Sequence, residues 1–205
     1  MEDVLDLYAE DYDPHYPVVC FDESPYQLVR EVRIPLPTKE GQPRRYDYEY
    51  KREGSCNLFM FFQPLASWRH VKVTQRRTAK DYAQCLKDLV DVHFPDAILI
   101  SVVQDNLNTH TGAALYEAFE PKEARRILNK LEFRTTPKQG SWLNMAECTF
   151  AILLGQCLDQ RIPMITTVQR KCAAWEQRRK AAKATINWRF TTATAREKLK
   201  RLYPS

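Results

Sequence analysis

Three carboxylic acids stand in the most apolar surroundings that this sequence offers. Asp22 directly follows the apolar run 18–21, and Asp105 follows the largely apolar segment 97–104. Glu147 is the only charged residue between positions 143 and 158. Burying a charged carboxylate without a partner is costly in free energy, so a fold that buries these segments must supply partners for the acids. One divalent cation shared by all three would do so, and the pattern therefore favours a metal-binding acidic site.

The size and composition are those of a globular chain with a sizeable core. The chain has 205 residues, which suits one domain, and 44% of them are hydrophobic. No apolar run approaches the roughly 18 residues that a membrane span needs, and the acidic N-terminus is unlike a signal peptide. The six cysteines form no C-x-x-C pair, which favours buried, reduced thiols over disulfides or zinc sites. We therefore expect a cytoplasmic protein without a membrane partner.

Charge is distributed unevenly along the chain, although the net charge is only +5. Residues 170–205 hold 11 Lys and Arg against two acids, a net charge of +9, which leaves −4 for the rest of the chain. The first 16 residues hold six acids and no Lys or Arg. A basic segment on a mildly acidic body indicates a polyanionic partner, nucleic acid first, although a solvated helix face would have the same composition.

Hydrophobic periodicity and turn residues predict a mixed α/β chain. Strands are expected at 18–21, 26–34, 57–63, 70–74, 97–103 and 131–135, with a loop at 36–54. Helices are expected from an N-cap at Thr78 to 93, and at 112–119, 121–131, 143–158 (buried, because it is nearly all apolar) and 166–185. Early strands without helices between them imply an antiparallel meander, and the later alternation implies parallel strands. Two of the acids then fall at strand ends, where the functional sites of α/β sheets gather.

Local spacing separates the acids from their neighbours. Because a strand alternates its side chains, Asp22 and Glu23 face opposite ways, and we expect Asp22 in the site. Asn106 could hydrogen-bond a metal-bound carboxylate at Asp105, or it could simply be a turn residue. His110 could orient Asp105 or contact a phosphate, or simply start a helix.

Asn144 precedes Glu147 by three residues, which puts both on one face of a helix. We expect Asn144 to support that acid. For any one of the three acids taken alone, a helix cap, a turn or an ion pair is the alternative explanation.

The three sequence blocks that carry the acids resemble those of bacterial insertion-sequence transposases related to the mariner group. The blocks are Val18–Glu23 (VVCFDE), Asp105–His110 (DNLNTH) and Thr136–Glu147 (TPKQGSWLNMAE). Two further segments, Arg45–Tyr50 and Trp188–Thr192, share the resemblance, which runs from about Asp13 to Pro204.

The resemblance implies a DDE-type enzyme with a ribonuclease H-like fold: a mixed five-stranded central sheet, an antiparallel meander plus parallel strands, with helices on both faces. It implies that Asp22, Asp105 and Glu147 are catalytic and hold two Mg²⁺ or Mn²⁺ ions. The implied activity is DNA cleavage at transposon ends, then strand transfer of the freed 3′-hydroxyl into target DNA. A homodimer on DNA, in the bacterial cytoplasm at the nucleoid, is expected with it.

The resemblance also suggests how the chain is divided. We expect an acidic lead-in at 1–17, a catalytic core at 18–160, and a basic helical extension at 161–205 packed on that core. Members of the family usually carry an N-terminal helix-turn-helix region that reads the transposon ends. We expect that region to be absent here, either encoded as a separate subunit, cut away or lost. Gln139 stands where the family has His, and Pro163 adds a bend after the catalytic helix.

Cationic and aromatic residues near these blocks are predicted to contact DNA. The cations expected on phosphates are Arg44, Arg45 and Lys138 near the acids, and Arg178, Arg179 and Lys183 within one and a half turns of the basic helix. A solvated surface is the alternative for each of them. Trp142 could stack on a splayed base, or pack as a hydrophobic staple against the helix that follows it.

Three functions remain open from the sequence. The first is the catalytic domain of a DDE transposase. The second is a ribonuclease H-like nuclease without strand transfer, and the third is a non-catalytic DNA-binding remnant of a transposase. The three intact acids favour catalysis, and the long block around Trp142 and Glu147 favours a transposase.

Overall fold

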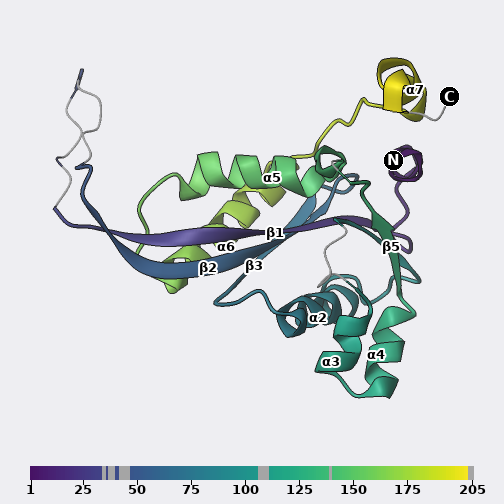
Figure 1. The fold of residues 1–205 in the computed structure, drawn as a ribbon, viewed down its shortest axis with the longest axis horizontal. Coiled ribbons are helices and arrows are strands. Elements are labelled where there is room, and N and C mark those ends of the chain that lie inside the picture. The colour runs from purple at the N-terminus through teal and green to yellow at the C-terminus, as the bar shows by residue number, and fades with distance from the viewer. Residues whose placement is uncertain (34–35, 37–39, 42–46, 106–110, 139, 203–205) are drawn as a thin grey trace.

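A mixed five-stranded sheet forms the centre of the molecule (Figure 1), in the order β3-β2-β1-β4-β5. The structure, a computed structural model, describes residues 1–33, 36, 40–41, 47–105, 111–138 and 140–202. The strands are β1 Val18–Glu31, β2 Tyr50–Gln63, β3 Trp68–Thr74, β4 Ile100–Gln104 and β5 Leu131–Thr135. β1, β2 and β3 pair antiparallel, whereas β4 pairs parallel with both β1 and β5. The predicted meander followed by parallel strands is confirmed, and the fold is ribonuclease H-like.

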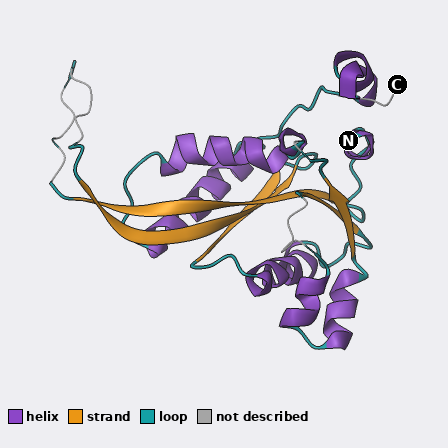
Figure 2. Cartoon of the chain, viewed as in Figure 1, coloured by secondary structure: helices purple, strands orange, loops and turns teal. Residues whose placement is uncertain are grey.

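Helices cover both faces of this sheet (Figure 2), as the sequence predicted. One face carries α5 (Met145–Leu153) and α6 (Ile165–Ala181). The other carries α2 (Ala79–Asp88), α3 (Ala113–Ala118) and α4 (Pro121–Leu128). Among the described residues, no helix is long and apolar enough to cross a membrane.

The alternation of side chains along β1 divides the interior into two cores. Val18 and Cys20 belong to the core under α5 and α6, whereas Val19 and Phe21 belong to the core under α2, α3 and α4. Because successive residues of a strand point to opposite faces, the next residue in the Val18–Cys20 series, Asp22, points toward the α5 side. The same alternation sends Glu23 toward the α2 side.

β1 and β2 are longer than the sequence predicted. The two expected strands at 18–21 and 26–34 form one strand, and residues 50–54, expected in a loop, begin β2. β1 continues through Pro25, where it pairs with Asn57 of β2, because its ladder to β4 covers only Val18–Cys20. A proline without an N–H to donate is tolerated where one side of the strand is unpaired.

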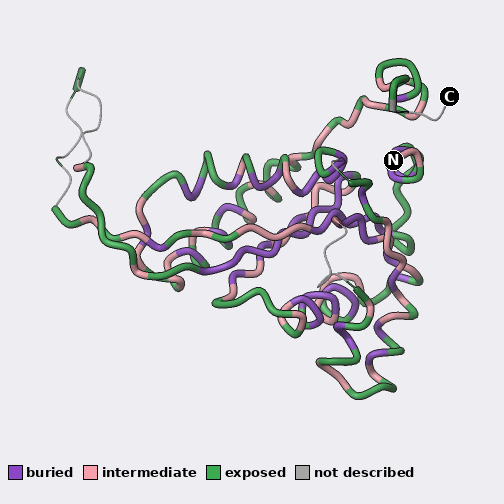
Figure 3. Tube along the Cα trace, viewed as in Figure 1, coloured by how far each residue is buried: buried purple, intermediate pink, exposed green. Residues whose placement is uncertain are grey.

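Gly54 marks a bulge in this pair of strands. The register shifts between Gln27 and Val29, and Gly54 has a φ of 98°. A bulge with a left-handed residue favours glycine and increases the local twist. The outer part of the β1–β2 pair reaches away from the body, and its surface is mostly exposed (Figure 3).

The two ends of the described chain lie side by side. α1 (Glu2–Tyr8) packs against α7 (Thr192–Lys198) (Figure 1), where Arg196 binds Glu2 with two hydrogen bonds of 2.7 and 2.8 Å. Val4 and Leu5 of α1 are buried in the core beneath α5 and α6. The acidic N-terminal residues therefore belong to the packed body, and they neutralise part of the basic C-terminal charge.

The predicted helices agree with the observed helices more closely at their starts than at their ends. Thr78 caps α2 in a capping box with Asp81, as predicted, but the α-helix ends at Asp88 and a π-helical turn, Leu89–His93, completes it. The predicted helix at 143–158 is likewise α5 followed by a π-helical turn, Leu154–Leu158. The expectation that this helix is buried all round is wrong, because one face of it is exposed, at Cys148, Ala151, Leu154 and Gly155.

Candidate functional site

Asp22 and Asp105 come to the same level on two adjacent strands. Cys20 of β1 is opposite Val103 of β4 in the parallel ladder, so the same register two residues further on sets Asp22 beside Asp105. Asp105 directly follows β4 and shares the side-chain direction of Val103, which faces α5. Asp22, however, does not end a strand as predicted, since β1 runs on for nine more residues to Glu31. Adjacent strands are roughly 4.8 Å apart, so the two carboxylates are neighbours.

Glu147 approaches from the helix that packs on this face. It lies in the first turn of α5, and α5 packs against β1 and β2. The negative charges of Asp105 and Glu147 are both close enough to act on the Asp22 carboxyl. All three acids are half-buried. The structure thus brings together the three acids that the sequence singled out.

Asn144 fixes the helix to the strand at this point. Its Oδ1 accepts a hydrogen bond from the Ala146 N–H at 3.1 Å and so caps α5, and its Nδ2 donates to the Phe21 carbonyl at 2.8 Å. Asn144 is 1% exposed, so neither bond competes with water. One side chain therefore sets the distance between the residue before Asp22 and the helical turn that carries Glu147.

Tyr8 braces the same junction from α1. Its hydroxyl donates to the Leu143 carbonyl at 2.9 Å and lies 3.2 Å from the Cys20 sulfur. Leu143 closes a short 3-10 turn, Ser141–Leu143, directly before the Asn144 cap. No local sequence pattern predicts this polar contact.

The electrostatics of Asp22 reflect its crowded position. Burial raises the pKa of the Asp22 carboxyl to about 7 from its ordinary 3.8, against the hydrogen bond that it accepts from the Glu23 N–H at 2.8 Å. The charges of Asp105, Glu147 and Glu23 make smaller contributions to the same rise in pKa. Such a group is stabilised by a cation beside it, because the cation compensates for lost hydration and for repulsion at once.

The described residues do not form a closed metal cage. Within the ranges given above, no group of three His, Cys, Asp or Glu side chains is arranged to hold a metal ion. The donor set nevertheless suits a hard divalent cation, since Asp22, Asp105 and Glu147 converge with carboxylate oxygens only, and these are the ligands that Mg²⁺ prefers.

Glu23 faces away from Asp22, as the alternation predicted, and belongs to a separate ion pair. Its side chain is 6% exposed and lies 3.2 Å from Arg77, the residue before the α2 N-cap. Arg77 thus holds the start of α2 against β1 and neutralises an acid on the opposite face from Asp22. No local sequence pattern predicts this pair.

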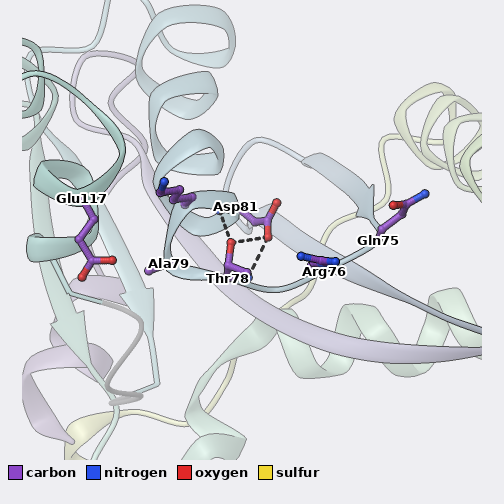
Figure 4. A pocket seen from close by; sticks show the side chains of 7 residues that line it. Gln75, Arg76, Thr78, Ala79, Asp81 and Glu117 are labelled. Carbon is purple, nitrogen blue, oxygen red and sulfur yellow. Dashed lines mark hydrogen bonds between the residues drawn. The ribbon is translucent and has the colours of Figure 1, made fainter.

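None of the three acids lines the hollow at the N-terminus of α2. It has a volume of about 540 Å³ and is lined by Gln75, Arg76, Thr78, Ala79, Lys80, Asp81 and Glu117 (Figure 4). Thr78 and Asp81 point toward each other there and are engaged in the α2 capping box. These two side chains therefore serve the N-terminus of α2.

The remaining predicted residues are placed as follows. Lys138 and Trp142 line a second hollow of about 380 Å³, where the Trp142 ring is 42% exposed and meets Phe190 edge to face at 5.3 Å. Arg178 and Lys183 are exposed, but Arg179 is half-buried, so the three do not share one solvated face. Arg44, Arg45, Asn106, His110 and Gln139 lie outside the described residues.

The sequence-based reading missed Arg69 in β3. It is 6% exposed and lies close enough to Arg179 for the two charges to repel. The signal was present, because Arg69 occupies a core-facing position in the alternation with Val71 and Val73.

The chain is similar to known proteins both in sequence and in fold. The family model described as DDE superfamily endonuclease matches residues 17–169. Two solved structures, the Mos1 mariner paired end complex with Mn and the Mos1 strand transfer complex, each give a TM-score of 0.58 at 18% identity and cover 89% of this chain. A pre-cleavage Mos1 transpososome gives 0.52 at 16% identity over 91% of this chain. No curated protein sequence matches significantly.

The structural likeness concerns the fold. The chain spans 55% of the length of the first two Mos1 chains and 61% of the third. The family model covers both strands that carry the aspartates and the helix that carries Glu147. The chain belongs to the DDE superfamily endonucleases.

Proposed function

We propose that this chain is the catalytic domain of a transposase, which cleaves DNA at transposon ends and joins the freed 3′-hydroxyl to target DNA. The observation that carries the proposal is the convergence of Asp22, Asp105 and Glu147 from two adjacent strands and one helix. Membership of the DDE endonucleases supports a phosphodiester as the substrate class. The similar solved structures, a Mos1 paired end complex and a Mos1 strand transfer complex, support transposon DNA in particular.

Asp22, Asp105 and Glu147 are the residues that would hold two divalent ions, Mg²⁺ or Mn²⁺. Bound there, the ions would activate the attacking hydroxyl and stabilise the leaving oxygen of a phosphodiester. Solved Mos1 complexes with Mn and with Mg support this choice of metals. The Asp22 carboxyl also supports a bound metal ion. Its burial and the nearby acids disfavour the charged carboxylate, which a cation would stabilise.

The other residues of the site position the acids. Asn144 links the Phe21 carbonyl to the N-terminus of α5, so the Asp22 and Glu147 carboxylates keep a fixed separation. Holding reacting groups in the right geometry contributes substantially to catalysis, and small displacements reduce the rate sharply. The hydroxyl of a water would attack in cleavage and the DNA 3′-hydroxyl in joining, so no Ser or Tyr of the protein has to act as a nucleophile. Asn106 and His110 complete the proposed surroundings.

DNA would lie across the exposed side of the acids. Lys138 and Trp142, on the rim of one hollow before α5, would contact a phosphate and a base respectively. The wider contacts proposed are Arg44, Arg45, Arg178, Arg179 and Lys183. Phosphate contacts of this kind position the protein on DNA and make binding depend on salt.

The proposed function also involves partners and DNA-end recognition. We propose action as a homodimer on paired DNA ends, with end recognition by a helix-turn-helix region that could be a separate subunit. The division into a lead-in at 1–17, a core at 18–160 and an extension at 161–205, and the location at the bacterial nucleoid in the cytoplasm, remain part of this proposal.

A plasmid assay tests the function. The protein is incubated with supercoiled plasmid and Mg²⁺ or Mn²⁺, beside Asp105→Asn as the matched variant of equal size. We expect metal-dependent nicking that the variant loses. DNA binding without any nicking would refute the catalytic proposal and favour a non-catalytic remnant. Adding an oligonucleotide with a free 3′-hydroxyl separates the remaining alternatives, because nicking without joining identifies a nuclease that lacks strand transfer.

A further inference from the structure

Arg69 is a buried cation whose donors are mostly unpaired. It is 6% exposed on the α6 side of β3. Its Nη2 donates to the Ala184 carbonyl after α6, but its Nε and Nη1 have no hydrogen-bond partner. A guanidinium carries five N–H donors, and leaving buried charged donors without acceptors is unfavourable.

Aromatic rings do not remove this deficit. The Arg69 guanidinium carbon lies 5.2 Å from the centre of the Phe62 ring and 5.7 Å from that of Trp175. Stacking on rings stabilises the face of a guanidinium. The N–H groups, however, point outward in its plane and still need acceptors.

A second arginine with the same deficit lies beside it. The Nε of Arg179, from α6, is buried without a hydrogen-bond partner. Burial, with a smaller contribution from the charge of Arg179, lowers the pKa of Arg69 to about 10. Two like charges with unpaired donors are stabilised together by one anion between them.

The nearest acid does not balance these cations. Glu176 raises the pKa of Arg69, but its carboxylate accepts hydrogen bonds from the Val71 N–H at 2.7 Å and lies 3.3 Å from the His70 ring. Arg69 lines a hollow of about 170 Å³. Lys180, one turn along α6 from Glu176, also lines this hollow and adds another positive charge. This edge of the sheet therefore has a local excess of positive charge and an opening to solvent.

We infer that Arg69 and Arg179 form an oxyanion subsite that binds a phosphate of the DNA backbone. The inference rests on the proposed function for the identity of the anion, but the unpaired donors call for an oxyanion in any case. In-plane N–H pairs of arginine match the geometry of phosphate oxygens. Lys180 would add a point charge at the entrance.

The subsite is on the same face of the sheet as the three acids. Arg69 is opposite Phe62, and Phe62 is opposite Cys20, two residues before Asp22. Two strand spacings and two residues along the strand put the Cα atoms of Arg69 and Asp22 about 12 Å apart. α6 ends beside Arg69, near the end of the sheet where α5 begins, so one DNA strand could reach both places.

Inorganic phosphate tests the subsite without DNA or metal. Thermal unfolding is followed in phosphate and in chloride at matched ionic strength. We expect phosphate to raise the Tm of the wild type, and this rise to disappear in Arg179→Gln and Arg69→Met. Arg125→Gln, an exposed arginine on α4 across the sheet, is the matched control and should keep it. An equal rise in all four proteins would overturn the inference.

Arg69→Met gives a second, opposite readout. Because it removes a buried cation with unpaired donors, its Tm in chloride should equal or exceed that of the wild type. A large loss of Tm would mean that Arg69 is a satisfied structural residue, which contradicts the inference. If this variant does not fold at all, the phosphate response of Arg179→Gln decides.

Binding of a labelled DNA duplex at several salt concentrations identifies the source of the phosphate. Losing one phosphate contact should reduce the slope of log K against log salt by about 1 in Arg179→Gln and leave it unchanged in Arg125→Gln. A lost phosphate response with an unchanged slope would assign the subsite to free phosphate and overturn the DNA assignment. Both readouts are independent of nicking, so this inference and the proposed catalysis can fail separately.

Discussion

Replacing Asn144 by alanine should damage both stability and catalysis, because one side chain makes two buried bonds. The variant loses the α5 cap, worth about 1 kcal/mol, and leaves the buried Phe21 carbonyl without its partner, worth about 1–3 kcal/mol. The expected loss in the free energy of unfolding is therefore about 2–4 kcal/mol. For a chain of this length, that is a fall in Tm of about 5–12 °C.

Urea unfolding at a temperature where both proteins are folded measures this loss, and metal-dependent nicking measures the catalytic effect. Since the bond to Phe21 sets the position of Glu147 relative to Asp22, we expect the nicking rate of the folded variant to fall by about 100-fold, with little change in DNA binding. Thr149→Val is the control. Thr149 is equally buried on α5, but its hydroxyl bonds only to the Met145 carbonyl within the same helix. A stable Asn144→Ala protein that nicks DNA at the wild-type rate would refute the reasoning.

Three further predictions concern side chains on β1 or in contact with it. Asp22→Asn should stabilise the metal-free protein at pH 8, because the raised pKa of Asp22 means that folding stability is lost as pH rises from about 4 through about 7. This loss of folding stability is at most about 4 kcal/mol, and about 1–2 kcal/mol after allowing for partial exposure. The gain, measured by thermal unfolding in EDTA, should shrink at pH 5, and no gain at pH 8 would contradict it. Arg77→Gln should lower the free energy of unfolding by about 1–2 kcal/mol by removing the ion pair of Arg77 with the buried Glu23, an effect that Glu23→Gln in the same chain should partly reverse in urea unfolding. Tyr8→Phe should destabilise by about 1–2 kcal/mol in the same assay through its lost bond to Leu143, and an unchanged midpoint would show that bond to be unimportant.

The sequence predicted the parts of the site that depend on local pattern. Apolar runs identified the segments of β1 and β4, and alternation separated Asp22 from Glu23 correctly. The helical spacing of Asn144 and Glu147 predicted that they share one helix face, which is wrong, because Asn144 is the extended N-cap of α5. These signals are local, because side-chain direction follows from two or four neighbouring residues.

The sequence could not predict contacts between distant segments. The extension of β1 through Pro25 depends on its pairing with β2, and the register of Asp22 beside Asp105 depends on the parallel ladder to β4. Neither pairing has a signal within its own segment. The pairing of Arg69 with Arg179 joins residues that are 110 positions apart, and only their burial in the fold distinguishes them from surface arginines.

Binding of Mn²⁺ to the purified protein tests the central claim most directly, that Asp22, Asp105 and Glu147 share one cation site. Titration followed by the electron paramagnetic resonance signal of free Mn²⁺ measures binding without DNA or turnover. The proposal predicts binding by the wild type that Asp105→Asn and Glu147→Gln each weaken strongly, while Glu23→Gln, on the opposite face, binds as the wild type does. Equal Mn²⁺ binding by the wild type and by the Asp105 and Glu147 variants would contradict it.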